Sequence, residues 1–355
     1  MNSLDTDKIN KIKSYPARVT IVSPTFNRAE LIVSTIESIF EQQYKDYKYI
    51  IIDDGSTDQT IKIVQKLFKN KKNCFYLHHD NIGEAKTVNI GWNICNSEYF
   101  LQVNSDDTIE PNLLQEMVAS LDSNADAVGA YSDFYVINKT GMVTENFKNV
   151  EWNFIDALSA FSCYPAAPGA VIRKSAFKDL KKIKDENFKY INDIKMIWNM
   201  ALRGDFVYIP QSLASWRSHE GGISADRYKS INEVTAWADE YFSQKDLPVD
   251  VKNAEKKCRE SIDGHCLRLL ERSSVEPIAV NVVKYLVESK KELTNEITVL
   301  AHDNDILSVI NKENEDRIIM LTNSLSWKIT IPLREISKFI KKVIRVIKRI
   351  IRNKL

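Results

Sequence analysis

The sequence is poor in cysteine, with five residues in 355, and none of them form the close pairs that zinc sites and redox motifs require. The odd number argues against a disulfide framework, so we expect a reduced, cytosolic setting. No run of about 18 uncharged apolar residues occurs, which excludes a conventional membrane-spanning helix. The first residues include acids and lysines where a signal peptide would be apolar.

The sequence also lacks an internal repeat and any recognised nucleic-acid-binding motif. Apolar residues make up 44% and charged residues 27%, as in ordinary globular proteins. The net charge of +1 conceals an asymmetry, because residues 328–355 hold ten Lys or Arg and one acid. The rest of the chain is therefore mildly acidic. This distribution predicts a tail that meets an anionic surface, and it argues against nucleic acid as a partner.

The basic tail has helical periodicity. From Ile336 onward, isoleucine, valine and phenylalanine recur at helical spacing, with lysine and arginine between them. A helix of this kind can lie in a membrane interface, held by apolar burial and by anionic lipid. We therefore expect residues 321–355 to place the protein at the inner face of the cell membrane as a peripheral protein. Packing of this helix on the protein's own body remains the alternative.

Short apolar runs alternate with amphipathic segments over the first 135 residues. This alternation predicts right-handed strand–helix–strand crossovers and therefore a mainly parallel, Rossmann-like α/β sheet. A polar loop is expected from Trp216 to Ser224, and beyond Asp226 the pattern is helix after helix with few turn signals. The expected strands are 19–23, 49–53, 74–78, 99–103 and 127–131, and the expected helices are 28–43, 58–68, 84–95 and 111–121.

Four aspartates follow two of these expected strands: Asp53 and Asp54 after one, Asp106 and Asp107 after another. In an open parallel sheet, ligands bind outside the carboxyl ends of the strands. Clustered carboxylates are costly unless cations or hydrogen-bond donors compensate them, and hard oxygen ligands suit Mg²⁺ or Mn²⁺. Either pair alone could simply form a turn, but their joint position favours a metal and diphosphate site.

Four segments resemble, in order, the signatures of family-two inverting glycosyltransferases with the GT-A fold. They are Ile21–Arg28, Ile51–Asp58, Asn81–Gly83 and Asn104–Asp107. The resemblance spans roughly residues 17 to 225. It implies transfer of a sugar from a nucleotide-diphosphate sugar, with a UDP-sugar favoured. The implied acceptor is a glycan or lipid-linked glycan in surface polysaccharide synthesis.

The same resemblance implies three parts of the chain. A GT-A catalytic domain would occupy residues 1–225, a helical extension residues 226–320 and the basic tail residues 321–355. Within the tail region, Ser324–Arg334 is similar to a segment found near the ends of bacterial cell-surface glycan transferases.

The resemblance assigns donor-binding roles to individual residues. Pro24 and Phe26 would line the base pocket with Glu30 close by. Asp54 would accept a hydrogen bond from the base, and Gly83 would let the backbone approach the nucleotide.

A second set of residues would hold the diphosphate. Asp106 would be the metal-binding acid of a D-x-D signature, with Asp107 beside it and His219 as a further metal ligand. Arg217 would contact phosphate, and Mn²⁺ or Mg²⁺ would be the cofactor. The first acid of the signature is Asn104 here, which can accept a hydrogen bond from ribose but carries no charge.

The catalytic base of an inverting transferase is a carboxylate that deprotonates the acceptor hydroxyl. Asn192 and Asp193 resemble the family's Glu-Asp pair at the start of a helix, with Asn in place of Glu, and Asp193 is the predicted base. A helix N-cap is the alternative role for Asp193. The family's G-x-x-x-A-R-N pattern also departs here, because its arginine position is Val88; whether Lys86 substitutes stays open.

Two rival functions follow from these departures. A catalytically silent, membrane-associated module that binds nucleotide sugars would explain why Asn104 and Asn192 each replace an acid. A nucleotidyltransferase would share the sheet and the metal, but it should carry a Gly-rich phosphate loop after the first strand, and residues 24–28 have none.

Overall fold

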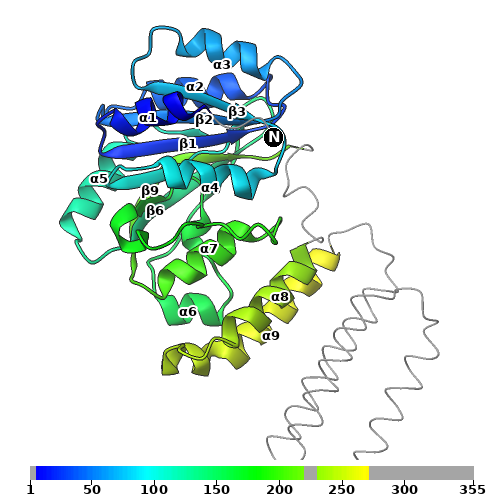
Figure 1. Cartoon of the computed structure of the whole chain (residues 1–355). Helices are drawn as coiled ribbons and strands as arrows, with labels where there is room; N and C mark the ends of the chain where they lie inside the picture. The colour runs from blue at the N-terminus through cyan, green and yellow to red at the C-terminus, as the bar shows by residue number, and fades with distance from the viewer. Residues whose placement is uncertain (1–4, 220–229, 272–355) are drawn as a thin grey trace, which may run out of the picture. The chain divides into compact units, whose positions relative to one another are not determined.

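A computed structural model of the chain describes residues 5–219 and 230–271 (Figure 1). The expected tail helix, most of the expected helical extension and the end of the predicted loop after His219 lie outside these residues. The described residues up to His265 belong to one compact unit. No helix within the described ranges is long and apolar enough to cross a membrane.

The centre of this unit is a nine-stranded sheet in the order β3-β2-β1-β4-β8-β6-β9-β5, with β7 paired to β6. The first four strands are parallel, as expected, whereas β8 runs antiparallel to β4 and β6. The sheet is therefore mixed beyond β4. The strands are β1 Val19–Thr25, β2 Tyr47–Asp54, β3 Cys74–His79, β4 Tyr99–Gln102, β5 Thr108–Ile109, β6 Gly129–Ile137, β7 Val143–Phe147, β8 Val171–Arg173 and β9 Phe206–Arg217.

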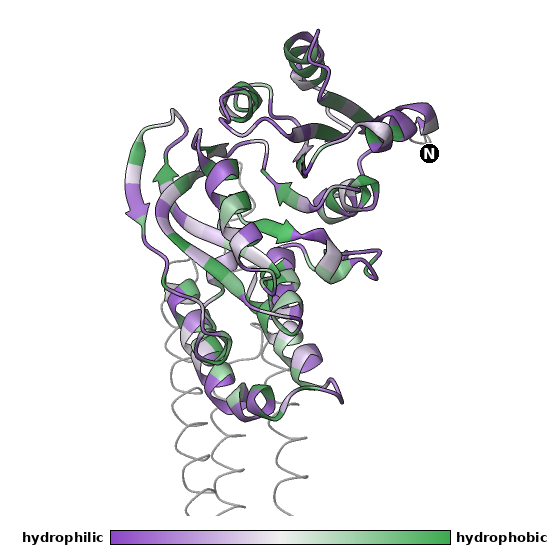
Figure 2. Cartoon of the chain, turned by 90° about the vertical axis from the view of Figure 1, so that its left-hand side faces the viewer, coloured by the Kyte–Doolittle hydropathy of each residue, from purple (hydrophilic) through white to green (hydrophobic). Residues whose placement is uncertain are grey.

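Helices cover both faces of the parallel strands, so those strands are buried on two sides. Along β2, Tyr49 and Ile51 belong to one apolar cluster and Ile50 and Ile52 to the other. This explains the continuous apolar run, and Figure 2 shows the strands as largely hydrophobic segments. The helices are α1 Thr6–Ser14, α2 Ile32–Phe40, α3 Thr60–Phe68, α4 Glu84–Ile94, α5 Leu113–Ser123, α6 Phe154–Ser159, α7 Asn192–Ala201, α8 Ile231–Phe242 and α9 Val249–Glu271.

Helix α4 lies unusually close to the sheet because of Gly91. A β-carbon at this position would stand 2.6 Å from Val22 Cγ1, so only glycine lets the helix approach β1 this closely. The start of α4 is thereby held beside the carboxyl ends of β1 and β4.

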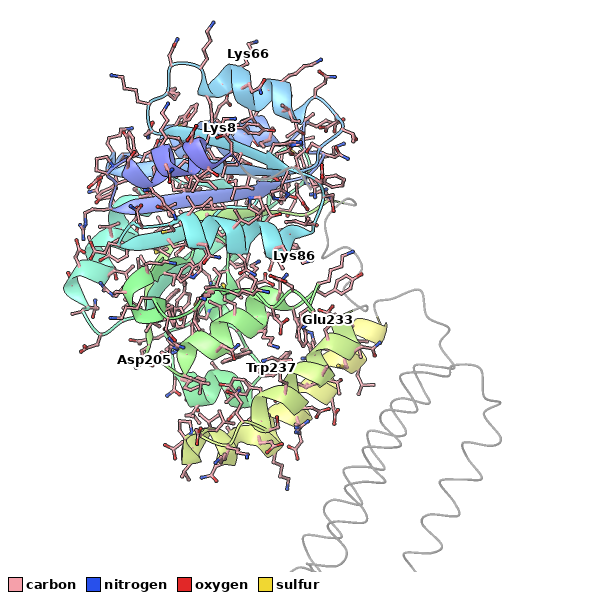
Figure 3. The ribbon with its side chains drawn as sticks, in the orientation of Figure 1. Lys8, Lys66, Lys86, Asp205, Glu233 and Trp237 are labelled. Atoms are coloured by element: carbon pink, nitrogen blue, oxygen red, sulfur yellow. The ribbon has the colours of Figure 1, made fainter. Side chains whose placement is uncertain are left out.

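Helix α8 packs beside α7 (Figure 1). The rings of Trp198 and Trp237 lie 6.1 Å apart between their centroids. At the other end of the contact, the Glu233 carboxylate accepts hydrogen bonds from the backbone N–H groups of residues 189–191 at 2.6–3.1 Å. Figure 3 labels Glu233 and Trp237 on α8. The helix after the α/β domain therefore fixes the segment that leads into α7.

One predicted boundary is wrong. Trp216 and Arg217 were expected in a polar loop, but they are the last residues of β9. The strand continues because it pairs with β6 as far as Ile137 and with β5 at Ser215. This extension places His219 only two residues beyond a strand end.

Candidate active site

The loops that follow β1 and β2 are tied to each other by hydrogen bonds. Asn27 adopts a left-handed backbone conformation (φ 51°), which asparagine tolerates. Its side-chain oxygen accepts from Thr57 N at 2.8 Å, while Ser56 Oγ accepts from Asn27 N at 2.9 Å. The two loops therefore form one rigid edge of the site.

Asp53 is an internal support of this edge. Its buried carboxylate accepts from Ser56 N at 3.3 Å and from the Tyr76 hydroxyl at 3.3 Å, and it lies 2.7 Å from His78 Nδ1. These contacts fill its capacity as an acceptor. Asp53 therefore stabilises the turn after β2, which was the alternative to a role in metal binding.

Asp54 holds the backbone of the next loop. Its carboxylate accepts from Ile82 N at 2.7 Å and from Gly83 N at 3.0 Å. Gly83 has φ 94° and ψ 152°, a conformation essentially restricted to glycine, and no atom lies within 4 Å of where its β-carbon would be. The space above Gly83 is therefore open to a ligand, and Asp54 keeps the loop in place.

We predict that Gly83→Ala lowers the free energy of unfolding by about 1–3 kcal/mol, because alanine would be strained at this φ. Donor affinity should fall as well, since the loop relaxes away from Asp54. Thermal unfolding and nucleotide titration would measure the two effects. Lys66→Ala, an exposed change on α3, is the control and should alter neither. An unchanged melting temperature in Gly83→Ala would contradict the prediction.

The remaining residues predicted for the base pocket differ in exposure. Pro24 is buried within β1, and because β4 pairs only as far as Val22, its missing N–H breaks no bond on that side. Phe26 is 44% exposed at the end of the strand, an unusual position for a large apolar side chain. Glu30 is exposed and its carboxylate lies 2.8 Å from Lys139 Nζ. Phe26 is thus the side chain available to stack on a ligand.

The two neighbouring acids Asp106 and Asp107 have different surroundings. Asp106 Oδ2 lies 3.0 Å from His219 Nε2 and 3.2 Å from Arg28 Nε. Asp107 is buried, and its carboxylate accepts from Arg217 N at 2.8 Å and from the Asn104 side chain at 3.1 Å. Burial and the adjacent Asp106 charge raise the pKa of Asp107. Only Asp106 therefore presents its carboxylate to the open side of the site.

Arg217 is engaged by the protein itself. Its guanidinium donates to Asp106 O at 2.7 Å, to the carbonyls of Asn138 and Lys139 at 3.1 Å and to Ser34 Oγ at 3.2 Å. These bonds join the end of β9 to the loop after β4. The observed role of Arg217 is to hold this loop, and the predicted phosphate contact would require it to exchange some of these partners.

Asp106 and His219 fit a divalent cation. Asp106 Oδ2 and His219 Nε2 lie 3.0 Å apart and contact each other directly, and their oxygen and nitrogen atoms are of the kinds that ligate Mg²⁺ or Mn²⁺. Mg²⁺ is commonly held by one or two side chains together with substrate phosphates. Among residues 5–219 and 230–271, no group of three His, Cys, Asp or Glu side chains could hold a metal without such help.

Asp193 lies in the first turn of α7, but it is not the cap of that helix. The N-cap residue is Ile191, which makes no side-chain cap bond. The Asp193 side chain is exposed to solvent. Partial desolvation by the surrounding protein raises the pKa of Asp193, Lys184 opposes the shift and Glu84 adds to it. A raised pKa at the site edge suits a general base.

Sequence reasoning missed Glu84 and Lys184. Glu84 Oε1 accepts from Lys184 Nζ at 2.8 Å and from Gln102 Nε2 at 3.1 Å, and its Oε2 accepts from Asn192 Nδ2 at 3.1 Å. Lys184 is 3% exposed. A helix-opening glutamate and a loop lysine 100 positions apart carry no signal in one sequence, since only the tertiary fold brings them together.

These contacts extend into one chain of hydrogen bonds across the site. Gln102 Nε2 also donates to Asn104 Oδ1 at 2.7 Å, and Asn104 in turn donates to Asp107. The chain runs from the start of α7, through α4, to the loop that carries Asp106. Both asparagines that replace a family acid therefore use their amide N–H to satisfy a carboxylate, Asp107 in one case and Glu84 in the other.

Comparison with known proteins agrees with this geometry. Residues 20–181 match the model of glycosyl transferase family 2. An uncharacterized glycosyltransferase of Haemophilus influenzae is 25% identical over 226 residues, which cover 61% of this chain and 70% of that protein. TarS of Staphylococcus aureus, a poly(ribitol-phosphate) beta-N-acetylglucosaminyltransferase, is 26% identical over 185 residues, which cover 50% of this chain and 31% of TarS.

Solved structures share the fold. The crystal structure of S. aureus TarS 1–349 in complex with UDP has a TM-score of 0.56 at 19% identity, and the match covers 74% of this chain and 75% of that one. The mannosyltransferase PcManGT from Pyrobaculum calidifontis, in complex with GDP-Man and Mn²⁺, has a TM-score of 0.53 at 16% identity and covers 79% of this chain and 81% of its own.

Proposed function

We propose that the chain is a family-two glycosyltransferase with the GT-A fold, and that it transfers a sugar with inversion from a nucleotide-diphosphate sugar to a glycan or lipid-linked glycan. One observation carries the proposal. A continuous set of hydrogen bonds joins the loop that carries Asp106 to the helix that carries Asp193. The proposed donor site and the proposed catalytic base are thereby connected by one set of hydrogen bonds.

The residues divide the reaction between them. Asp193 would take the proton from the acceptor hydroxyl as that oxygen attacks the anomeric carbon. Asp106 and His219 would hold a divalent cation, which when bound stabilises the charge that develops on the leaving diphosphate. Phe26 and the open backbone at Gly83 would bind the nucleobase of the donor. Asp54 and Asp107 would keep these groups in place from within the protein.

A UDP-sugar is the favoured donor. TarS has the same fold and was crystallised with UDP and with UDP-GlcNAc. PcManGT, with GDP-Man and Mn²⁺, supports the same use of a cation but shows that the fold also takes a purine nucleotide. The identity of the nucleobase in the donor therefore needs a direct measurement.

The acceptor and the place of action are proposed from the sequence. The basic residues of 328–355 would hold the protein at the anionic inner face of the cell membrane, where lipid-linked glycans are available. The two asparagines give little support to a catalytically silent scaffold, because Asn104 and Asn192 each donate a hydrogen bond to a carboxylate of the site.

A donor-hydrolysis screen tests the proposal. The purified full chain would be incubated with UDP-, GDP- and dTDP-sugars, with Mn²⁺ or with EDTA. We expect nucleotide release from a UDP-sugar that depends on the metal, because the developing diphosphate charge needs the cation. Calorimetric titration with UDP and Mn²⁺ accompanies the screen. Absence of both turnover and metal-dependent UDP binding would contradict the proposed function.

A further inference from the structure

Glu84 stands between three elements of the site. It is the first residue of α4, directly after Gly83, and its carboxylate contacts Gln102 at the end of β4 and Asn192 at the start of α7. Its third partner is Lys184 in the loop before α7. Helix α7 also carries Asp193, and the loop after β4 carries Asn104 and Asp106, so movement of Glu84 would disturb both.

The backbone of this region is fixed independently. Asn89 on α4 accepts with its side-chain oxygen from Ile183 N and Lys184 N, both at 3.0 Å, and its amide donates to Lys184 O at 2.9 Å. Lys184 is therefore held against the same helix that carries Glu84. Although burial raises it, the contacts with Lys184, Asn192 and Gln102 hold the pKa of Glu84 below its usual range. These partners therefore favour the ionised form of Glu84.

We propose that Glu84 is the positioning carboxylate of the reaction centre. It orients Asn192, and through it the first turn of α7, so that Asp193 faces the acceptor hydroxyl. The inference rests on the proposed function of Asp193 and adds a residue to it. Glu84 is 29% exposed at its side chain, so it borders the open site and is not a residue of the apolar core.

This arrangement explains why the residue at position 192 carries an amide. A glutamate there would bring a second carboxylate to within hydrogen-bonding distance of Glu84 Oε2, and the like charges would repel each other. Asn192 instead donates an N–H. Carboxylate and amide therefore form a complementary pair whose two members should be exchangeable between α4 and α7.

The test is a double-mutant cycle on transfer activity of the full chain, with the donor found by the screen. Glu84→Gln and Asn192→Glu should each lower kcat by about 10- to 100-fold, because a small misplacement of the base is enough for such a loss. The KM for the donor should stay within about twofold. The exchanged protein, Glu84→Gln with Asn192→Glu, should recover part of the lost kcat, since one carboxylate and one amide again face each other, while Lys184 lacks its carboxylate at position 84.

The pH dependence of kcat distinguishes a positioning role from a loss of stability, because a loss of stability alone would not shift the acidic limb. The charges that face Asp193 are Lys184 and Glu84, and Cys163 is the other titratable neighbour. Removal of the Glu84 charge favours ionised Asp193, so the acidic limb of kcat should shift to lower pH in Glu84→Gln. In Asn192→Glu, an added negative charge should shift it to higher pH.

Glu186→Gln is the matched control. It removes an acid from the loop that carries Lys184 but contacts neither Glu84 nor Asn192, and it should leave kcat unchanged. If Asp193 proves essential but the exchanged protein is no more active than the single variants, or if Asn192→Glu keeps the wild-type kcat, the inference is wrong. If the wild type and Asp193→Asn have the same kcat for sugar transfer, the proposed function of Asp193 is wrong instead. Circular dichroism verifies that each variant is folded.

Discussion

Asp193→Asn is expected to lower kcat for sugar transfer by about 10³-fold while donor binding stays unchanged. A positioned general base contributes about 10²- to 10⁴-fold, and asparagine keeps the size of the side chain but cannot accept the proton. Because Glu233 holds the segment before α7 and the N-cap residue of α7 is Ile191, not Asp193, the substitution should also preserve the helix. Steady-state kinetics and nucleotide titration on the same protein would separate the two effects.

The pH dependence of the wild type follows from the same residue. Asp193 acts as a base only when ionised, and its pKa is raised by loss of solvation. The acidic limb of kcat should therefore lie above the usual range of an aspartate, and activity should rise as the pH increases through it. Asp193→Asn should lose this limb. Asp205→Asn, at an exposed position just before β9, is the control and should retain it. A retained limb in Asp193→Asn would assign the base elsewhere.

Asp106→Ala is expected to abolish the stimulation by Mn²⁺ and to lower kcat/KM by at least about 100-fold, because the site loses the carboxylate that faces His219. Donor hydrolysis at varied Mn²⁺ concentrations would measure this. His219→Ala should have a smaller effect, since a carboxylate supplies charge as well as a ligand atom.

Asp107→Asn distinguishes a metal ligand from a support. The Asp107 carboxylate is occupied by Arg217 N and Asn104, so its replacement should lower the melting temperature while the response to Mn²⁺ remains. If Asp107→Asn lost the response and Asp106→Ala kept it, the roles of the two acids would be reversed.

The sequence was informative where the local pattern and the tertiary role agree. The apolar runs of β1 to β4 and the helices between them were predicted because strands buried on both faces are continuously apolar. It was less informative after β4, where β8, β6 and β9 form a mixed sheet whose pairing partners are distant in sequence. The extension of β9 through Arg217 was missed because its residues are polar, although they pair on both sides.

By itself, the sequence determined the α/β order and the positions of the acids at the strand ends, since both depend on residue type and spacing along the chain. Asp193 as the base stays a prediction from the family resemblance. Only the tertiary structure decided which acids face the open site. Asp53 and Asp107 are satisfied by neighbouring N–H and O–H groups, and Asp106 is left facing His219. It also placed the Glu84 carboxylate within hydrogen-bonding distance of the Asn192 amide. Ionic and hydrogen-bond partners are set by distance in space, which spacing along one chain does not reveal.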